Sequence, residues 1–191
     1  MKNLHGTTVV VFRDRKEGRI HIAADGAVSC GTIRIEQKNK KIVQCPGYTL
    51  VTSGCIGECQ QIRRAIGRVF SGVVVEGGYP STLEDALVDQ LTPVKGDASG
   101  YLVLPSGDIY LVGCEGCVLK MSSDLMCLGS GGDIARGAIL GMTRENGKAA
   151  YGYREATKEA IKIAAKFCGS TNDTIYTVSV HCPINSHDKE D

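Results

Sequence analysis

Residues that could carry out nucleophilic catalysis stand near the start of the chain, where Gly6-Thr7-Thr8 places a threonine directly after a glycine. A threonine hydroxyl is a weak nucleophile unless a base lies beside it, and a chain that begins at the threonine supplies its own α-amine as that base. Because that amine titrates at about 7.7 to 8.0, much of it is neutral at working pH. Cleavage after Gly6 would therefore make Thr7 a nucleophile; the alternative is that Thr7 and Thr8 only open an edge strand.

A charged pair could support such a nucleophile. Asp25 precedes Gly26 at the end of an expected strand, where its carboxylate could accept backbone hydrogen bonds or pair with a cation. In Asn39-Lys40-Lys41-Ile42, one lysine should point inward and the other toward solvent. An inward Lys41 stays charged only if a carboxylate such as Asp25 compensates it. The alternative is a solvated pair of surface lysines.

A glycine-rich segment, Gly129-Ser130-Gly131-Gly132, precedes an expected helix. Its backbone N–H groups and the Ser130 hydroxyl could serve an anion, a substrate or the proton network of a nucleophile. It matches neither the dinucleotide-binding fingerprint nor the Walker loop. The alternative is a helix N-cap with a flexible approach.

Length and charge limit the classes of protein to which the chain could belong. A chain of 191 residues makes about one domain and can bury a sizeable core. With 22 Lys and Arg against 21 Asp and Glu, the chain resembles neither a basic nucleic-acid binder nor a disordered acidic tail. Apolar runs are far shorter than the roughly 20 residues that span a bilayer, and residues 1–6 lack the apolar stretch of a signal peptide. We expect a soluble, cytoplasmic protein.

The cysteines indicate a reducing compartment. Nine cysteines cannot all pair within one chain, which favours free thiols. Cys114-Glu-Gly-Cys117 is the only CxxC segment, and a structural zinc site usually needs two such half-sites or added histidines. We therefore interpret this segment as a turn that contains glycine.

Strand pairs and helix pairs alternate in blocks along the chain. Hydrophobic periodicity and turn residues predict the order ββ, αα, ββ, αα, β, which favours an α+β protein with antiparallel sheets and segregated helix layers. The expected elements are a hairpin of 7–12 with 20–24, a helix carrying Ile62 to Phe70, a helix from Ser81 that ends before Pro93, a hairpin of 101–104 with 109–112, a strand at 125–128, helices from about Asp133 and through 156–167, and a strand at 174–180.

Taken together, five segments resemble the proteasome β-type and HslV family of threonine peptidases. They are Gly6-Thr7-Thr8-Val9-Val10, Ala24-Asp25-Gly26, Asn39-Lys40-Lys41-Ile42, Ser53-Gly54-Cys55-Ile56-Gly57 and Leu128-Gly129-Ser130-Gly131-Gly132, in the family's order and approximate spacing. The match runs from Thr7 to about Val180. It implies a four-layer αββα sandwich of the N-terminal nucleophile class, with no organic cofactor.

The resemblance also implies roles for individual residues. Thr7 would be the nucleophile, Asp25 and Lys41 the charged pair that tunes it, Ser130 the hydroxyl that completes the proton path, and Gly54 the donor to the oxyanion. Ser29 would bind the substrate backbone as an added strand. The first specificity pocket, small to medium and apolar, would be lined by Val28, Thr52 and Ile56.

Processing, assembly and a cation follow from the same resemblance. Residues 1–6 would be a short propeptide that the chain removes itself, residues 7–184 the catalytic domain and residues 185–191 a polar tail. The domain would assemble into stacked homo-oligomeric rings and degrade unfolded proteins with an HslU-like AAA+ ATPase. Main-chain carbonyls of Ala165, Cys168 and Thr171 would hold a monovalent cation such as Na⁺.

Two departures and two alternatives accompany this interpretation. The turn at 13–18 adds two residues between Thr7 and Asp25, and neither Lys166 nor Phe167 is acidic where family members carry an acid. The missing acid should slow removal of the propeptide. The alternatives are a small-molecule amidase of the same fold, which the lack of long inserted loops disfavours, and a non-catalytic ring subunit in which the bond before Thr7 is never cut.

Overall fold

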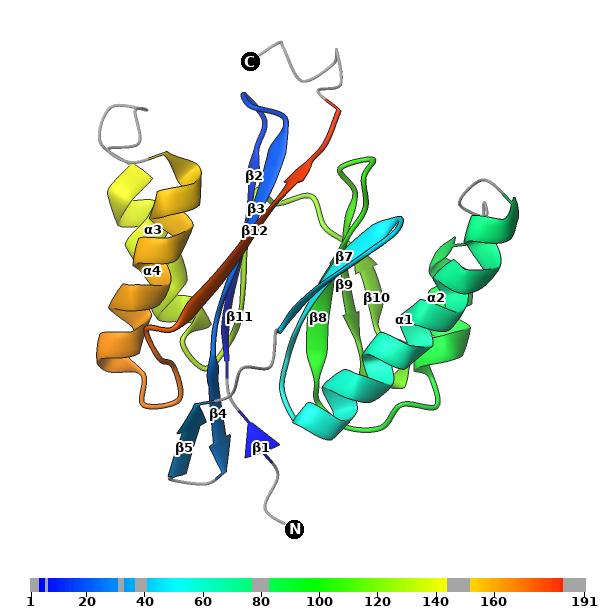
Figure 1. The fold of residues 1–191 in the computed structure, drawn as a ribbon, viewed down its shortest axis with the longest axis horizontal. Coiled ribbons are helices and arrows are strands. Elements are labelled where there is room, and N and C mark those ends of the chain that lie inside the picture. Colours follow the sequence, from blue (N-terminus) through cyan, green and yellow to red (C-terminus); the bar gives the residue numbers. More distant parts are fainter. Residues whose placement is uncertain are drawn as a thin grey trace.

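Two facing β-sheets lie between two layers of helices in the computed structural model (Figure 1). The structure describes residues 4–5, 7–30, 33–36, 41–76, 83–143 and 152–183. Within these ranges, only the backbone is described for residues 4–5, 29–30, 33–36 and 73–76. Its strands are β1 Leu4–His5, β2 Thr8–Asp14, β3 Arg19–Asp25, β4 Ala27–Cys30, β5 Ile33–Glu36, β6 Ile42–Cys45, β7 Tyr48–Ser53, β8 Ser99–Val103, β9 Ile109–Gly113, β10 Val118–Lys120, β11 Leu125–Gly129 and β12 Ile175–His181. Its helices are α1 Ile56–Glu76, α2 Leu83–Leu91, α3 Gly132–Thr143 and α4 Tyr153–Phe167.

All described strand pairs are antiparallel. One sheet has the order β11-β2-β3-β12 and the second the order β10-β9-β8-β7-β6. A small third sheet, β1-β4-β5, lies at one end of the sandwich (Figure 1). This arrangement confirms the α+β class and the segregated helix layers that the sequence predicts.

The central strands carry apolar residues on both faces, because each sheet packs against the other sheet on one face and against helices on the other. Along β2, Val9 and Val11 pack in the core between the two sheets, whereas Val10 packs beneath α3 and α4. Side chains alternate between the faces of a strand, so a strand with one solvated face would alternate apolar with polar residues. The unbroken apolar run at the start of β2 thus marks a strand in the middle of four layers.

Helices α1 and α2 cover the outer face of the five-stranded sheet (Figure 1). The predicted stripe of α1 is buried, with Ile62 and Ile66 fully inaccessible, and Leu83, Leu87 and Leu91 of α2 face the same core. Residue Ser81, proposed as the start of a capping box, lies outside the described residues. At the end of α4, Phe167 is 75% exposed, so this last apolar residue of the helix lies beyond the core.

Three further features of the structure bear on the expectations from composition. The segment Cys114–Gly116 forms a short 3₁₀ turn with positive φ at Glu115 and Gly116, as interpreted. The eight cysteines whose side chains are described form no disulfide. Within the described residues, no helix combines the length and apolar character needed to cross a membrane.

Close strand packing generates a stability prediction. A Cβ at Gly100 in β8 would overlap the carbonyl oxygen of Val51 in the neighbouring strand, whereas a Cβ at Gly72 in α1 would meet nothing within 4 Å. Gly100→Ala should therefore destabilise the fold by about 1 to 3 kcal/mol. The matched control Gly72→Ala should stabilise it by about 0.5 to 1 kcal/mol. Urea denaturation of both variants measures this, and equal midpoints would contradict the packing.

Candidate active site

The carboxylate of Asp25 accepts hydrogen bonds from four separate points of the chain. Its Oδ1 lies 2.7 Å from the backbone nitrogen of Thr8 and 2.7 Å from Nζ of Lys41. Its Oδ2 accepts the backbone N–H groups of Ala27 at 3.0 Å and Asn172 at 3.1 Å. Asp25 therefore joins the start of β2, the start of β4, the approach to β6 and the loop before β12.

The ion pair between Asp25 and Lys41 is almost dry. Asp25 has no exposed surface and Lys41 is 8% exposed, which confirms that Lys41 points inward. Burial lowers the pKa of the Lys41 ammonium from its ordinary value, and the charge and hydrogen bond of Asp25 act in the opposite direction. A buried charge of this kind is retained only with a partner, and each of the two groups is the other's partner.

Thr7 lies at the point where the pair meets the four-stranded sheet. It is 2% exposed and directly precedes Thr8, whose N–H shares the Asp25 oxygen with Lys41. Its carbonyl packs against Gly129, where a Cβ would overlap it, and Gly129 has φ of 86°. The glycine-rich segment predicted to serve the nucleophile is therefore in contact with Thr7.

A set of hydroxyl and thiol groups extends from this point toward the end of α4. The Thr8 hydroxyl lies 2.6 Å from that of Thr171, and the Cys168 thiol lies 3.4 Å from the Ser130 hydroxyl. Burial alone would raise the pKa of the Cys168 thiol, but hydrogen bonds with Ser130, Thr171 and the backbone of Ser170 outweigh it and lower the pKa. Ser130 thus has a titratable neighbour that the sequence did not suggest.

The predicted oxyanion donor, Gly54, occupies the turn between β7 and α1. Its φ is 123°, and a Cβ would come within 2.7 Å of the Cα of Ala98, so the position requires glycine. Whether its N–H serves an oxyanion remains a prediction.

Two of the three predicted pocket residues, Val28 and Thr52, are buried, and Ile56 is half-buried at the start of α1. The Thr52 hydroxyl accepts a hydrogen bond of 3.0 Å from Arg63, which also donates to the Lys41 carbonyl at 3.1 Å. A guanidinium therefore lies behind a pocket wall that the sequence predicts to be apolar.

The predicted substrate edge is paired in this structure with the segment that precedes Thr7. Strand β1 runs antiparallel to β4, with His5 opposite Ser29 and Leu4 opposite Cys30. The side chain of Ser29 lies outside the description, but its backbone forms an edge that accepts an added strand.

The proposed cation ligands lie together where α4 ends. Ala165 belongs to the last turn of α4, whose carbonyls have no partners within the helix. The Cys168 carbonyl accepts the Thr171 N–H at 3.1 Å and keeps a second lone pair. A monovalent cation held by these carbonyls and that of Thr171 stays a prediction. Lys166 and Phe167, where family members carry an acid, are both exposed, so neither contributes to the buried network.

Sequence reasoning did not identify Thr8, Asn172, Arg63 or the thiol of Cys168 as parts of this site. Each acts through a contact with a segment distant in sequence. A buried polar residue is informative because it must be paired, but burial is not visible in a single sequence. The observed arrangement brings a threonine, a buried ammonium and carboxylate pair, a serine and a thiol to one end of the sandwich, which is suited to hydroxyl activation.

Comparisons with known proteins agree with this arrangement. No family model matches the chain. The ATP-dependent protease subunit HslV of Petrotoga mobilis is 30% identical over 182 residues, covering 91% of this chain and 96% of that protein. Its counterpart in Roseobacter denitrificans is 29% identical over 184 residues, covering 92% of this chain and 95% of that protein.

Solved structures show the same fold. The eukaryotic HslV of Trypanosoma brucei superposes with a TM-score of 0.68 at 16% identity, over 91% of this chain and 99% of that chain. BPH of Thiobacillus denitrificans, in complex with epoxomicin, superposes with a TM-score of 0.67 at 18% identity. The match covers 92% of this chain and 99% of that chain. These likenesses confirm the four-layer sandwich.

The buried pair generates a prediction about stability. Asp25→Asn replaces one carboxylate oxygen with an NH₂ group, which cannot accept the hydrogen bonds that the four donors around Asp25 make. Lys41→Met leaves the carboxylate charge unpaired. Each should reduce the free energy of unfolding by about 3 to 5 kcal/mol. Asp173→Asn, an exposed acid in the same loop, is the control and should change it by less than about 0.5 kcal/mol. Chemical denaturation measures all three, and an unchanged midpoint for Asp25→Asn would refute the buried pair.

Proposed function

Because this chain belongs to the HslV family, we propose that it is the proteolytic subunit of an ATP-dependent protease, a threonine-type endopeptidase that degrades unfolded proteins to peptides. The observation that carries this function is the buried pair of Asp25 and Lys41 beside Thr7. Burying two charges costs free energy, and here the Lys41 ammonium shares one Asp25 oxygen with the N–H of Thr8, the residue next to Thr7.

In the proposed reaction, the Thr7 hydroxyl oxygen attacks the carbonyl carbon of the substrate while the freed α-amine of Thr7 takes the hydroxyl proton. The Lys41 ammonium favours the deprotonated forms of neighbouring groups, and Asp25 keeps that ammonium charged. The Gly54 N–H would donate to the oxyanion, a contribution of about 3 kcal/mol for donors of this kind.

Collapse of the tetrahedral intermediate breaks the C–N bond, and the α-ammonium gives its proton to the leaving nitrogen. An ester on Thr7 remains. Water, deprotonated by the same amine, then hydrolyses the ester and restores the Thr7 hydroxyl. Ser130 lies in the glycine-rich segment that contacts Thr7 and would relay protons within the site.

Removal of residues 1–6 is the step that frees the amine. In this step the Thr7 hydroxyl adds to the Gly6 carbonyl, an N-to-O acyl shift gives an ester, and water releases the leader. The pairing of β1 with β4 supports this proposal, because the leader already occupies the edge that a substrate strand would take. Before the cut the Thr7 nitrogen is an amide, so Asp25, Lys41, Ser130 or a bound water must accept the proton instead.

Assembly and location complete the proposal. Relatives of the chain are subunits of ATP-dependent proteases, which supports homo-oligomeric double rings that take substrate from an HslU-like ATPase. The odd number of cysteines, nine, favours a reducing compartment, and we infer a cytoplasmic location. When bound, a cation such as Na⁺ would supply positive charge to the carbonyls of Ala165, Cys168 and Thr171 and brace the loop that carries Asn172.

Thr7→Ala should abolish peptide hydrolysis, because it removes the attacking oxygen, while the protein still folds and assembles. Thr7→Ser keeps a hydroxyl at the same place and should keep measurable activity. Turnover of a fluorogenic peptide measures both variants. Full activity of Thr7→Ala would refute the assignment of the nucleophile.

The dependence of activity on pH tests the role of Lys41. On the acid side, kcat/KM should fall as the Thr7 amine is protonated, below the ordinary value of about 7.7 to 8.0, because the Lys41 ammonium disfavours a second positive charge. On the alkaline side it should fall as Lys41 loses its proton, below the ordinary lysine value of 10.5, because burial lowers the pKa. The profile is therefore bell-shaped. With circular dichroism confirming a folded protein, activity that stays constant through pH 10.5 would contradict a catalytic ammonium.

Assembly can be measured independently of catalysis. Light scattering should give a mass many times the 20.3 kDa of one chain, and peptidase activity should rise when an HslU-type ATPase and ATP are added. A monomer across a range of protein concentrations would contradict the proposed rings.

A further inference from the structure

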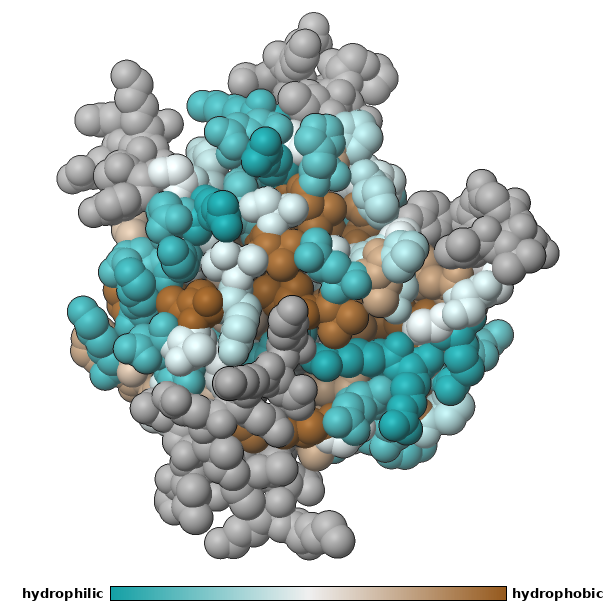
Figure 2. All heavy atoms as spheres, in the orientation of Figure 1, coloured by the Kyte–Doolittle hydropathy of each residue, from teal (hydrophilic) through white to brown (hydrophobic). Residues whose placement is uncertain are grey.

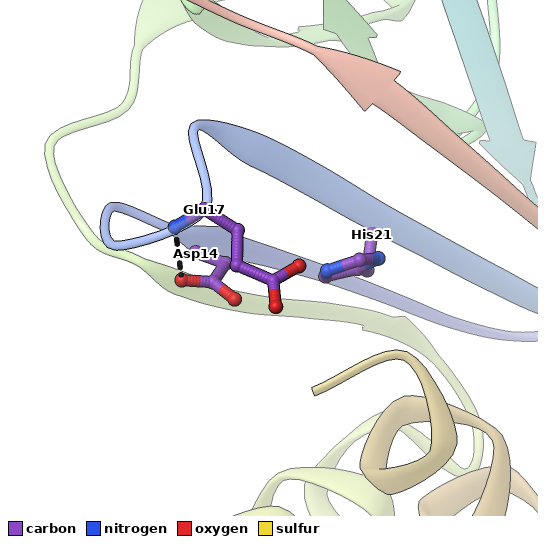
Figure 3. A group of neighbouring side chains, drawn as sticks. All are labelled: Asp14, Glu17 and His21. Atoms are coloured by element: carbon purple, nitrogen blue, oxygen red, sulfur yellow. Dashed lines mark hydrogen bonds between the residues drawn. The ribbon is translucent and has the colours of Figure 1, made fainter. Parts of the chain in front are cut away.

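A second group of ionisable side chains lies at the opposite end of the four-stranded sheet. Asp14, Glu17 and His21 meet at the hairpin between β2 and β3 (Figure 3). Because β2 has seven residues and rises about 3.3 Å per residue, Asp14 is about 20 Å from Thr8 at the other end of the strand. This hairpin group is therefore separate from the candidate active site.

The three side chains each bring a potential ligand atom to one place. One such atom from each residue lies within 4.8 Å of the other two. Asp14 is 3% exposed and His21 4% exposed, whereas Glu17 is exposed and leaves the group open to solvent. Two of the three groups are thus held in the interior, and an ion could enter past the third.

Both buried side chains have only part of their polar atoms paired. Nδ1 of His21 lies 2.9 Å from the Ser179 hydroxyl. The Oδ1 atom of Asp14 accepts the backbone N–H groups of Lys16 at 3.0 Å and Glu17 at 3.1 Å. Among the described residues, neither Nε2 of His21 nor Oδ2 of Asp14 has a hydrogen-bond partner. Neither atom is among the fully buried unpaired polar atoms, so both reach the solvent-open side of the group, where Glu17 lies and a ligand could enter.

The two carboxylates of the group favour a cation. Two carboxylates this close repel each other unless a positive charge lies between them. The adjacent arginines, Arg13 and Arg15, form ion pairs with Asp124. Burial lowers the pKa of His21, as do the nearby charges of Arg19 and Arg154, whereas Asp14 and Glu17 act in the opposite direction.

We propose that Asp14, Glu17 and His21 bind a divalent first-row transition-metal ion through the two carboxylates and Nε2 of His21, with water in the remaining positions. One imidazole with two carboxylates suits such an ion better than Mg²⁺ or Ca²⁺, which prefer oxygen ligands alone. The Ser179 contact would fix the orientation of the ring, the usual role of a group behind a metal-bound histidine. The ion would tie the hairpin turn to β3 and, through Ser179, to β12.

Titration of the purified full chain with Co²⁺ tests the proposal, because its visible absorption reports the ligands. Thiolates give a strong near-ultraviolet band with Co²⁺, so binding to the cysteines can be told apart from binding to His21 and the carboxylates. We expect one bound ion per chain at the hairpin, with d–d absorption and no thiolate band.

Variants assign the site. Asp14→Asn keeps the Oδ1 acceptor that caps the turn, and Glu17→Gln changes an exposed side chain, so both variants should fold. Each should weaken Co²⁺ binding at least about 10-fold, and Ser179→Ala should weaken it by about 10-fold. Glu84→Gln, an exposed acid on α2, should leave binding unchanged. Absence of Co²⁺ binding, a thiolate band as the only signal, or equal affinity in Asp14→Asn and Glu17→Gln would each overturn the proposal.

Discussion

The hydrogen bonds of the Asp25 carboxylate hold the end of the sandwich together. Its two oxygens bind Thr8, Lys41, Ala27 and Asn172, which come from four segments spread over most of the chain. A carboxylate without exposed surface is tolerated only when such donors replace water. The positions of Thr7, of the Lys41 ammonium and of the loop after α4 therefore depend on one another through this group.

The layered fold makes that arrangement rigid. Residues such as Val9 and Val11 pack against the second sheet while Val10 packs under α3 and α4, so the strand that leads from Thr7 is fixed on both faces (Figure 1). Apolar side chains also remain visible between the two sheets at the open edge, over β6 and β12 (Figure 2). A cavity of about 600 Å³ there is lined by Ile42 and Val43 of β6 and Tyr176 and Val178 of β12.

Sequence patterns predicted the elements with strong periodicity and the residues that stand in motifs. The stripe from Ile62 to Phe70 and the leucines of α2 repeat over several turns, so both helices were predictable. The hairpin of β6 and β7 was missed, because β6 has only four residues and β7 is buried on both faces, so neither alternates. Asp25 and Lys41 could be singled out from the sequence as a charged pair, and the resemblance implied their roles, whereas Thr171 and Asn172 contribute contacts that only the fold creates. The group at Asp14, Glu17 and His21 matches no motif, since the hairpin rather than a spacing rule brings it together.

The mass and N-terminal sequence of the purified, active protein test the central claim most directly. The mechanism needs a free amine on Thr7, so the active chain must begin at Thr7 and lack residues 1–6. An enzyme with full activity whose chain still begins at Met1 would contradict it.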